Sequence, residues 1–350
     1  MSKHTLYIGS FQKSDTAPIH RCEFDNGSGE ISLGEVYYDT RPSWLCKAKE
    51  SNKIFFVREA ENIGDAYGGG IGCFFDETQS PVLSNIGASG PCHLCEDGGN
   101  LYLACYREGA LVQLKWLYDG FSQDVKIIRH EGKSVNPMRQ NQAHPHFSLF
   151  TPDGKFLVVC DLGLDKILLY PYEKEKGIVG EAITHSAPEG SGPRHAVFSR
   201  DGRYLFVVTE MGGTVLSYQY DGLGGLVLVS ELDAMPKDAL DGEVQCAAIR
   251  LSPDGNELIV TERRSGSIVF FAIGKNGSLL REGAVRSAAC PRDAVFSPDG
   301  KWLLVACQQA DVINVYSYVG DISVPVSSRV RLMADCKLSE NSAPCCLLFV

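Results

Sequence analysis

The chain has 350 residues, of which 44% are hydrophobic and 22% are charged, and its formal net charge at pH 7 is −10. This composition is that of an ordinary soluble globular protein, and an acidic chain without basic runs is not expected to bind nucleic acid. Because no apolar run approaches the ~20 residues that span a bilayer, no membrane partner is expected either.

The first residues, MSKHTLYIGS, contain no basic segment followed by a long apolar one, so we expect no signal peptide and a cytoplasmic location. The 13 cysteines are then expected to be reduced thiols. Cys92 and Cys95 have a spacing that zinc sites use, but the alternation of a strand puts them on opposite faces. We therefore expect no metal site at this pair.

Six stretches of the chain repeat one plan: an opening residue that is usually proline, an apolar strand, a turn and a second apolar strand. In chain order the copies begin at residues 42, 91, 145, 193, 245 and 291. Four of the turns contain Asp-Gly, a strong hairpin signal because Gly accepts a positive φ without steric cost. The flanking runs are rich in Val, Leu, Ile and aromatic residues, which suit half-buried strands.

The copies start roughly fifty residues apart, which is room for four short strands and is the size of one propeller blade. The segment 344–350 (PCCLLFV) resembles the first strand of a further copy, and 5–10 (TLYIGS) offers its partner. Pairing of the two would complete a seventh blade and remove an exposed edge. We therefore predict an all-β, seven-bladed β-propeller closed by pairing of its N- and C-terminal strands, with residues 1–350 in one domain.

Two longer connections interrupt the pattern, at about 121–143 and about 232–244. Each precedes the first strand of a copy, so both are expected over the same rim of the propeller, where long loops are functional or mobile. The segment 62–72 contains three consecutive glycines but matches neither the phosphate-loop nor the dinucleotide pattern. It is predicted to be a structural turn.

The copies differ at one position in a way that indicates function. Eight residues before the turn glycine, the three best copies have His146, Arg194 and Arg292, whereas the copy at 245 has Ala247. The first strand of each propeller blade faces the central channel, so these three side chains are predicted to converge at the channel mouth. A repeat that served packing alone has no need of two arginines and a histidine there.

Further polar side chains lie close to this position in the pattern. His144, two residues before His146, points to the same side of an extended segment. Glu210 and Gln308 share a position eight residues after the turn glycine in their copies. Two arginines, a carboxylate and an imidazole can together bind an anion and transfer a proton.

Each of these side chains also has a structural interpretation. Arg194 and Arg292 are candidates for salt bridges between blades, and Glu210 is a candidate for balancing their charge. His93 and His195 lie in a repeated Gly-Pro-x-His phrase, where a structural role is favoured over substrate binding.

The segment Gly192–Leu205 (GPRHAVFSRDGRYL), followed by Glu210, resembles the lactonase propellers, as does the His144-x-His146 pair ahead of Asp161. That family includes the cycloisomerase-2 type of 6-phosphogluconolactonase and the fungal 3-carboxy-cis,cis-muconate lactonizing enzyme. The resemblance covers essentially the whole chain. It implies a seven-bladed, metal-free cytosolic enzyme that uses no cofactor and acts on a lactone or its open acid.

The resemblance also implies the site. The His, two Arg and Glu of the muconate enzyme correspond by motif to His146 (or His144), Arg194, Arg292 and Glu210. The chain departs from the family pattern at 142–143, where Gln-Ala replaces Gly-Pro, and at 105–106, where Cys-Tyr replaces Asn-Tyr. Both departures bear on the shape of the pocket and so on the substrate.

We therefore expect a small anionic lactone as the partner, with its phosphate or carboxylate bound by Arg194 and Arg292, because guanidinium groups suit oxyanions. One arginine, Arg194 in our assignment, would also stabilise the oxyanion, and His146 or Glu210 would take the proton from water. Three interpretations stay open: a 6-phosphogluconolactonase-like hydrolase, a muconate-type cycloisomerase, and a non-catalytic binding platform. The remaining expected substrate contacts are His144, His195, His93 and Gln308.

Overall fold

The computed structural model describes residues 2–12, 14, 16–75, 80–235 and 244–350. The chain divides into two compact units, the first made of residues 1–12, 19–37 and 194–350 and the second of residues 13–18 and 38–193. The expected single domain stays a prediction. In the part of the chain that the structure describes, no helix is both long enough and apolar enough to cross a membrane.

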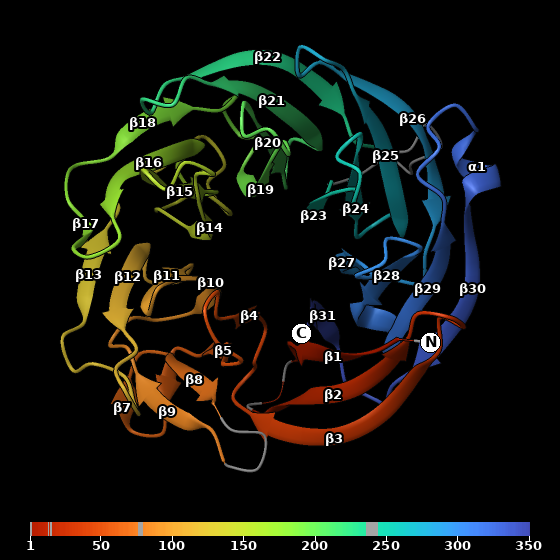
Figure 1. The fold of residues 1–350 in the computed structure, drawn as a ribbon. Coiled ribbons are helices and arrows are strands. Elements are labelled where there is room, and N and C mark those ends of the chain that lie inside the picture. Colours follow the sequence, from red (N-terminus) through yellow and green to blue (C-terminus); the bar gives the residue numbers. More distant parts are fainter. Residues whose placement is uncertain (1, 13, 15, 76–79, 236–243) are drawn as a thin grey trace. The chain divides into compact units, whose positions relative to one another are not determined.

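The first unit contains four four-stranded antiparallel sheets (Figure 1). One sheet has the order β3 (Ile31–Asp39), β2 (Ala17–Asp25), β1 (Lys3–Ser10) and β31 (Pro344–Phe349). The next is β19 (Pro193–Phe198), β20 (Tyr204–Thr209), β21 (Thr214–Tyr220) and β22 (Leu226–Asp233). The third is β23 (Cys246–Leu251), β24 (Glu257–Glu262), β25 (Ser267–Ile273) and β26 (Leu279–Arg286). The fourth is β27 (Pro291–Phe296), β28 (Trp302–Cys307), β29 (Val312–Tyr318) and β30 (Val330–Lys337). Two short helical segments accompany them, η1 (Gln308–Ala310) and α1 (Val326–Arg329).

The second unit contains three further sheets of the same kind. The first is β4 (Leu45–Lys47), β5 (Ile54–Arg58), β8 (Gly70–Phe74) and β9 (Val82–Asn85), beside a small ladder of β6 (Asn62–Ile63) and β7 (Ala66–Tyr67). The second is β10 (Pro91–Asp97), β11 (Asn100–Cys105), β12 (Ala110–Lys115) and β13 (Lys126–Arg129). The third is β14 (Pro145–Phe150), β15 (Phe156–Asp161) and β16 (Lys166–Glu173), which pairs both with β17 (Gly177–Ile178) and with β18 (Ile183–Ser186).

The sheet that contains both chain ends confirms the predicted closure. Strand β31 pairs antiparallel with β1, with Ile8 opposite Leu347 (Figure 1). The fully buried carboxylate of Asp293 in β27 fixes this strand from the side, because it accepts a hydrogen bond of 2.9 Å from the Leu347 amide. Its other oxygen pairs with Arg250 of β23. With seven sheets of blade size and hardly any helix in the described residues, the predicted all-β, seven-bladed fold class is confirmed.

The Asp-Gly turns form as predicted, and a hydroxyl residue ahead of each one completes them. In the hairpin of β19 and β20, Ser199 Oγ donates to Asp201 Oδ1 at 2.7 Å and accepts from the Tyr204 amide at 3.0 Å. Gly202 has a φ of 72°, which favours glycine. The same bonds recur in the other three hairpins, where the hydroxyl comes from Thr151, Ser252 and Ser297.

Burial falls along each sheet from the second strand to the fourth. The second strands β15, β20, β24 and β28 are buried at every residue, whereas the fourth strands β22, β26 and β30 are largely exposed. This pattern explains why the second strands read as continuous apolar runs, since both of their faces lie against protein.

The structure corrects one of the predicted long connections. The segment 121–143 is not a single loop, because β13 (Lys126–Arg129) pairs with β12 as the fourth strand of its sheet. Most of the other connection, 236–243, lies outside the described residues. The glycine-containing segment 62–72 forms the small β6–β7 ladder, as suits the structural turn that was predicted.

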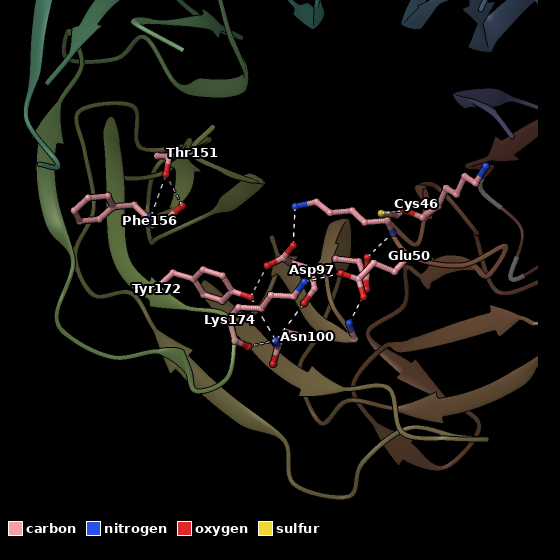
Figure 2. A network of polar contacts seen from close by, with 12 residues as sticks. Cys46, Glu50, Asp97, Asn100, Thr151, Phe156, Tyr172 and Lys174 are labelled. Atoms are coloured by element: carbon pink, nitrogen blue, oxygen red, sulfur yellow. Dashed lines mark hydrogen bonds and ion pairs between the residues drawn. The ribbon is translucent and has the colours of Figure 1, made fainter. Parts of the chain in front are cut away.

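A polar network joins the three sheets of the second unit, in the region of their β-turns (Figure 2). Asp97 at the end of β10 accepts hydrogen bonds from Lys49 Nζ (2.8 Å) and the Tyr172 hydroxyl (2.9 Å). Asn100 donates to the Lys174 carbonyl at 2.7 Å, and Lys174 Nζ pairs with Glu50 at 2.6 Å. These bonds reach from the β4 sheet to β16, so the network ties neighbouring sheets together at one end.

Candidate active site

The position that distinguishes the repeats has a structural cause, which is a β-bulge at the start of the first strand. In β27, Pro291 pairs with Cys307 and Asp293 with Ala306, so the strand register shifts at Arg292. The same shift leaves out His146 in β14 and Cys92 in β10. A bulge re-aims the side chain of the extra residue. In β14 and β27 the residue eight positions before the turn glycine is therefore the one directed out of the regular alternation.

In the first unit, Arg194 is the centre of a buried cluster, with only 2% of its surface exposed. Its Nε donates to Glu210 Oε2 at 2.8 Å, and its Nη1 donates to the Ala247 carbonyl at 2.8 Å and to His195 Nε2 at 3.0 Å. Glu210 directly follows β20 and is 4% exposed. The predicted pairing of Arg194 with Glu210 is therefore present.

A third arginine joins this cluster that the sequence analysis missed. Arg263 Nη2 lies 3.1 Å from Glu210 Oε2, so one carboxylate oxygen faces two guanidinium groups. Arg263 follows Gly255 by eight residues, which is the position that Glu210 and Gln308 occupy in their own copies. The signal was thus available in the repeat. In this copy the bulge position holds only Ala247. The positive charge comes instead from Arg263, which directly follows the second strand, β24.

Arg292 extends the cluster on the β27 side. Its Nη1 donates to Gln308 Oε1 at 3.2 Å, and its guanidinium carbon lies 5.3 Å from the centre of the Phe11 ring. Gln308 in turn donates to the Phe11 carbonyl at 2.8 Å and accepts a weak bond from Cys290 Sγ at 3.7 Å. The structure therefore places Arg292 and Gln308 in contact.

The three arginines act on one another electrostatically. Burial lowers the pKa of Arg194 to about 10, Arg263 and Arg292 lower it as well, and Glu210 opposes them. Arg194 still carries its proton at neutral pH. Burial raises the pKa of Cys290, and the same three arginines counter that rise. The three arginines act here together with two carboxylates, Glu210 and Glu262, so positive charge exceeds negative charge, which favours binding of an anion.

The carboxylate nearest in sequence to Arg263 has a different task. Glu262 is fully buried, and its oxygens accept the backbone N–H groups of Gln245 (2.9 Å) and Ser265 (2.6 Å). Asp161 has the same place in its own copy and accepts the N–H groups of His144 (2.8 Å) and Gly163 (3.0 Å). These carboxylates cap the turn after the second strand, so they position the chain and do not add to the anion site.

In the second unit, the two histidines of the His-x-His pair lie on one tyrosine. The ring of His144 stacks on Tyr106, with 4.2 Å between ring centres and an 11° angle between planes. The ring of His146 meets the same tyrosine edge-on, at 5.8 Å and 82°. Both histidines are less than 10% exposed. Tyr106 was noted in the sequence only as the residue after the departure at Cys105, and its stacking role was missed.

The two histidines of the Gly-Pro-x-His phrase have structural surroundings. His93 lies between Trp44 and Phe147, with ring centres 4.3 Å and 4.0 Å away, and its Nδ1 accepts a bond of 3.2 Å from the Ser148 amide. His195 accepts the hydrogen bond from Arg194. These contacts favour the structural interpretation over a direct substrate contact for both.

The site residues therefore fall into two groups that the structure assembles separately. Arg194, Glu210, Arg292 and Gln308 form one cluster with Arg263, and His144 and His146 form another with Tyr106. The predicted convergence of His146 with the arginines stays a prediction. Cys92 and Cys95, considered above for zinc, have contacts of their own: Cys92 Sγ faces the His146 carbonyl at 3.5 Å and Cys95 Sγ faces Ser148 Oγ at 3.3 Å.

Comparisons with known proteins agree with the seven-bladed fold. A family model described as "Lactonase, 7-bladed beta-propeller" matches residues 5–323. The 6-phosphogluconolactonase of Bacillus subtilis is 27% identical over 321 residues, which cover 88% of this chain and 89% of that protein.

Two solved structures of similar sequence share the fold over the full length of the chain. The periplasmic gluconolactonase of Pseudomonas aeruginosa superposes with a TM-score of 0.87 at 27% identity, covering 100% of this chain and 99% of that one. A Bacteroides fragilis protein, assigned provisionally as a 6-phosphogluconolactonase, has a TM-score of 0.88 at 26% identity, with 100% and 98% covered.

Proposed function

Because the chain belongs to the lactonase family of seven-bladed β-propellers, we propose that it hydrolyses a small anionic sugar lactone, in the manner of a 6-phosphogluconolactonase. The observation that carries this proposal is the pairing of the buried Arg194 and the partly buried Arg263 with the carboxylate of Glu210, with the charge of Arg292 also acting on Arg194. Guanidinium groups held in this way suit the oxygens of a phosphate or carboxylate.

The excess positive charge favours an anionic substrate over a neutral one. Two of the relatives named above point to different substrates, since one is a 6-phosphogluconolactonase and another a gluconolactonase. A phosphorylated lactone carries close to two negative charges at neutral pH, whereas gluconolactone itself carries none. The arginine cluster therefore supports the phosphorylated substrate.

The chemistry proposed for the cluster is electrostatic. When water adds to the lactone carbonyl, negative charge develops on the carbonyl oxygen, and a guanidinium N–H directed at that oxygen stabilises it. A donor placed in this way changes the rate by roughly 10²–10³-fold. Arg292 and Arg263 are the better candidates for phosphate binding, because three hydrogen bonds of Arg194 already direct its Nε and Nη1 to protein acceptors.

Glu210 fits the role of an orienting group better than that of the base. Its Oε2 faces both Arg194 and Arg263, and a carboxylate between two cations is stabilised in its ionised form and accepts a proton poorly. A histidine base is therefore the proposed alternative, with His146 as the residue that the sequence pattern predicts and His144 as its neighbour.

The proposal is tested by assaying hydrolysis of 6-phosphoglucono-δ-lactone and glucono-δ-lactone by the wild type and by Arg194→Ala. We expect kcat/KM of the wild type to be higher for the phosphorylated lactone, and Arg194→Ala to lose 10²-fold or more of it. Arg203→Ala is the matched control, because Arg203 lies in the hairpin turn of the same sheet and its side chain is 65% exposed.

Three results would count against the proposal. A wild type that hydrolyses neither lactone would contradict the activity, and equal rates on both lactones would contradict the substrate. An Arg194→Ala variant as active as Arg203→Ala would contradict the site. Consumption of a 3-carboxymuconate, followed by its ultraviolet absorbance, would instead indicate the cycloisomerase alternative.

A further inference from the structure

The contacts of His144 fix which of its ring nitrogens carries the proton in the neutral form. Nδ1 lies 2.7 Å from the Tyr106 carbonyl oxygen, which can only accept a hydrogen bond. Nδ1 must therefore be the protonated nitrogen, and the lone pair of the neutral imidazole is then on Nε2. A histidine base has this arrangement when a third group orients it.

Nε2 of His144 is available for chemistry. Among the described residues no side chain or backbone group is found bonded to this atom, and the residue as a whole is 8% exposed. A water molecule can therefore reach the lone pair without displacing a protein group. Availability of this kind is required of a base that must take a proton from water.

The position of the ring is fixed from two sides. One face is stacked on Tyr106, and the backbone N–H donates to Asp161 Oδ1 at 2.8 Å, while the backbone carbonyl accepts from the Leu162 amide at 3.0 Å. Asp161 is fully buried, and its second oxygen faces His130 Nδ1 at 2.7 Å. A base held in this way needs no rearrangement when the reaction begins.

We propose that His144, through Nε2, is the base that activates water in lactone hydrolysis, an assignment that rests on the proposed function. As the water oxygen bonds to the lactone carbonyl carbon, its proton passes to Nε2 and the carbonyl electron pair moves onto oxygen. When the tetrahedral intermediate collapses, the ring C–O bond breaks and the Nε2 proton passes to the leaving alkoxide. The products are the open hydroxy acid and neutral His144, whose Nδ1–H has remained on Tyr106 throughout.

In this assignment Asp161 is a positioning residue and His146 contributes to binding. Asp161 acts on the reaction only through the backbone of His144, which it holds beside Tyr106. His146, edge-on to the same ring, shapes the surroundings of the base.

The test compares His144→Gln, His144→Ala, His146→Gln and His146→Ala in the lactonase assay, with His185→Gln in β18 as the control for loss of a histidine. We expect His144→Gln to lower kcat by 10²–10⁴-fold with KM changed by no more than a few-fold, because the lost step is proton transfer. Added imidazole should restore part of the kcat of His144→Ala and none of the kcat of Arg194→Ala. His146→Gln should raise KM more than it lowers kcat.

The possible outcomes are distinguishable. An inactive wild type overturns the proposed function together with this assignment. An active wild type with a His144→Gln variant that keeps more than a tenth of its kcat overturns the assignment alone, as does a His146→Ala variant that imidazole rescues when His144→Ala is not rescued. If His144→Ala is poorly folded by circular dichroism, the isosteric His144→Gln decides through its ratio of kcat to KM effects.

Discussion

Replacing Glu210 by Gln should destabilise the protein and at the same time make its stability more sensitive to anions. The substitution keeps the shape of the side chain but removes the negative charge that faces Arg194 Nε at 2.8 Å and Arg263 Nη2 at 3.1 Å. Breaking a buried ion pair from one side costs about 3–5 kcal/mol. With unfolding entropy of about 2.1 cal/mol/K per residue over 350 residues, each kcal/mol corresponds to roughly 1.4 °C, so Tm should fall by roughly 4–7 °C.

A bound anion should replace the missing carboxylate. If phosphate binds the variant tenfold more tightly than it binds the wild type, saturating phosphate stabilises the variant by about 1.4 kcal/mol more, or roughly 2 °C. The assay is thermal unfolding at increasing phosphate and constant ionic strength. The control is Glu282→Gln, which removes a partner of the buried Arg329 in the same unit. Equal phosphate effects in the two variants, or an undiminished Tm in Glu210→Gln, would refute the reasoning.

Three further predictions concern activity, acid stability and a buried ion pair. Arg263→Met should raise KM for the phosphorylated lactone at least tenfold while hydrolysis of the neutral lactone changes little, as measured by initial rates on both substrates. Burial alone would raise the pKa of Asp97, but hydrogen bonds from Lys49 and Tyr172 outweigh this effect and lower the pKa. The Asp97 carboxylate therefore contributes its full stabilisation above its ordinary pKa of about 3.9, and this stabilisation is lost as the pH falls below that value. The difference in urea midpoint between the wild type and Asp97→Asn should therefore shrink from pH 6 to pH 3, and a constant difference would contradict the assignment. Arg329→Met should lower the free energy of unfolding by about 3–5 kcal/mol because it leaves the fully buried Glu257 without its partner, and urea unfolding beside a lactonase assay should show lost stability with unchanged kcat/KM.

The fold was predictable because the signal is repeated. Each Asp-Gly turn is ambiguous alone, but several of them at a period of roughly fifty residues specify four-stranded sheets, and the match between 5–10 and 344–350 specifies the final pairing. Strand β13 (Lys126–Arg129) was not predicted, since four residues of a mostly exposed fourth strand carry little apolar pattern.

The site was predictable only as far as the repeat register reaches. Register alone identified Arg194, Glu210, Arg292 and Gln308, and the same count applied to the copy with Ala247 would have identified Arg263. Contacts between sheets leave no such trace. The stacking of Tyr106 on His144 and the bond from His144 to the Tyr106 carbonyl depend on how two sheets pack, so neither follows from spacing in one strand.

The bulge at the start of the first strands separates the residues that hold the strands together from those whose side chains can be changed. Since the strand register shifts at Arg292 and His146, exchanging these side chains leaves the paired residues on either side of them in β27 and β14 unchanged. Each of these sheets therefore has one position whose side chain can change during evolution without disturbing the pairing of the strands. A laboratory search for new lactone preferences in this scaffold would do best to randomise those loci first, and to leave the strands behind them untouched.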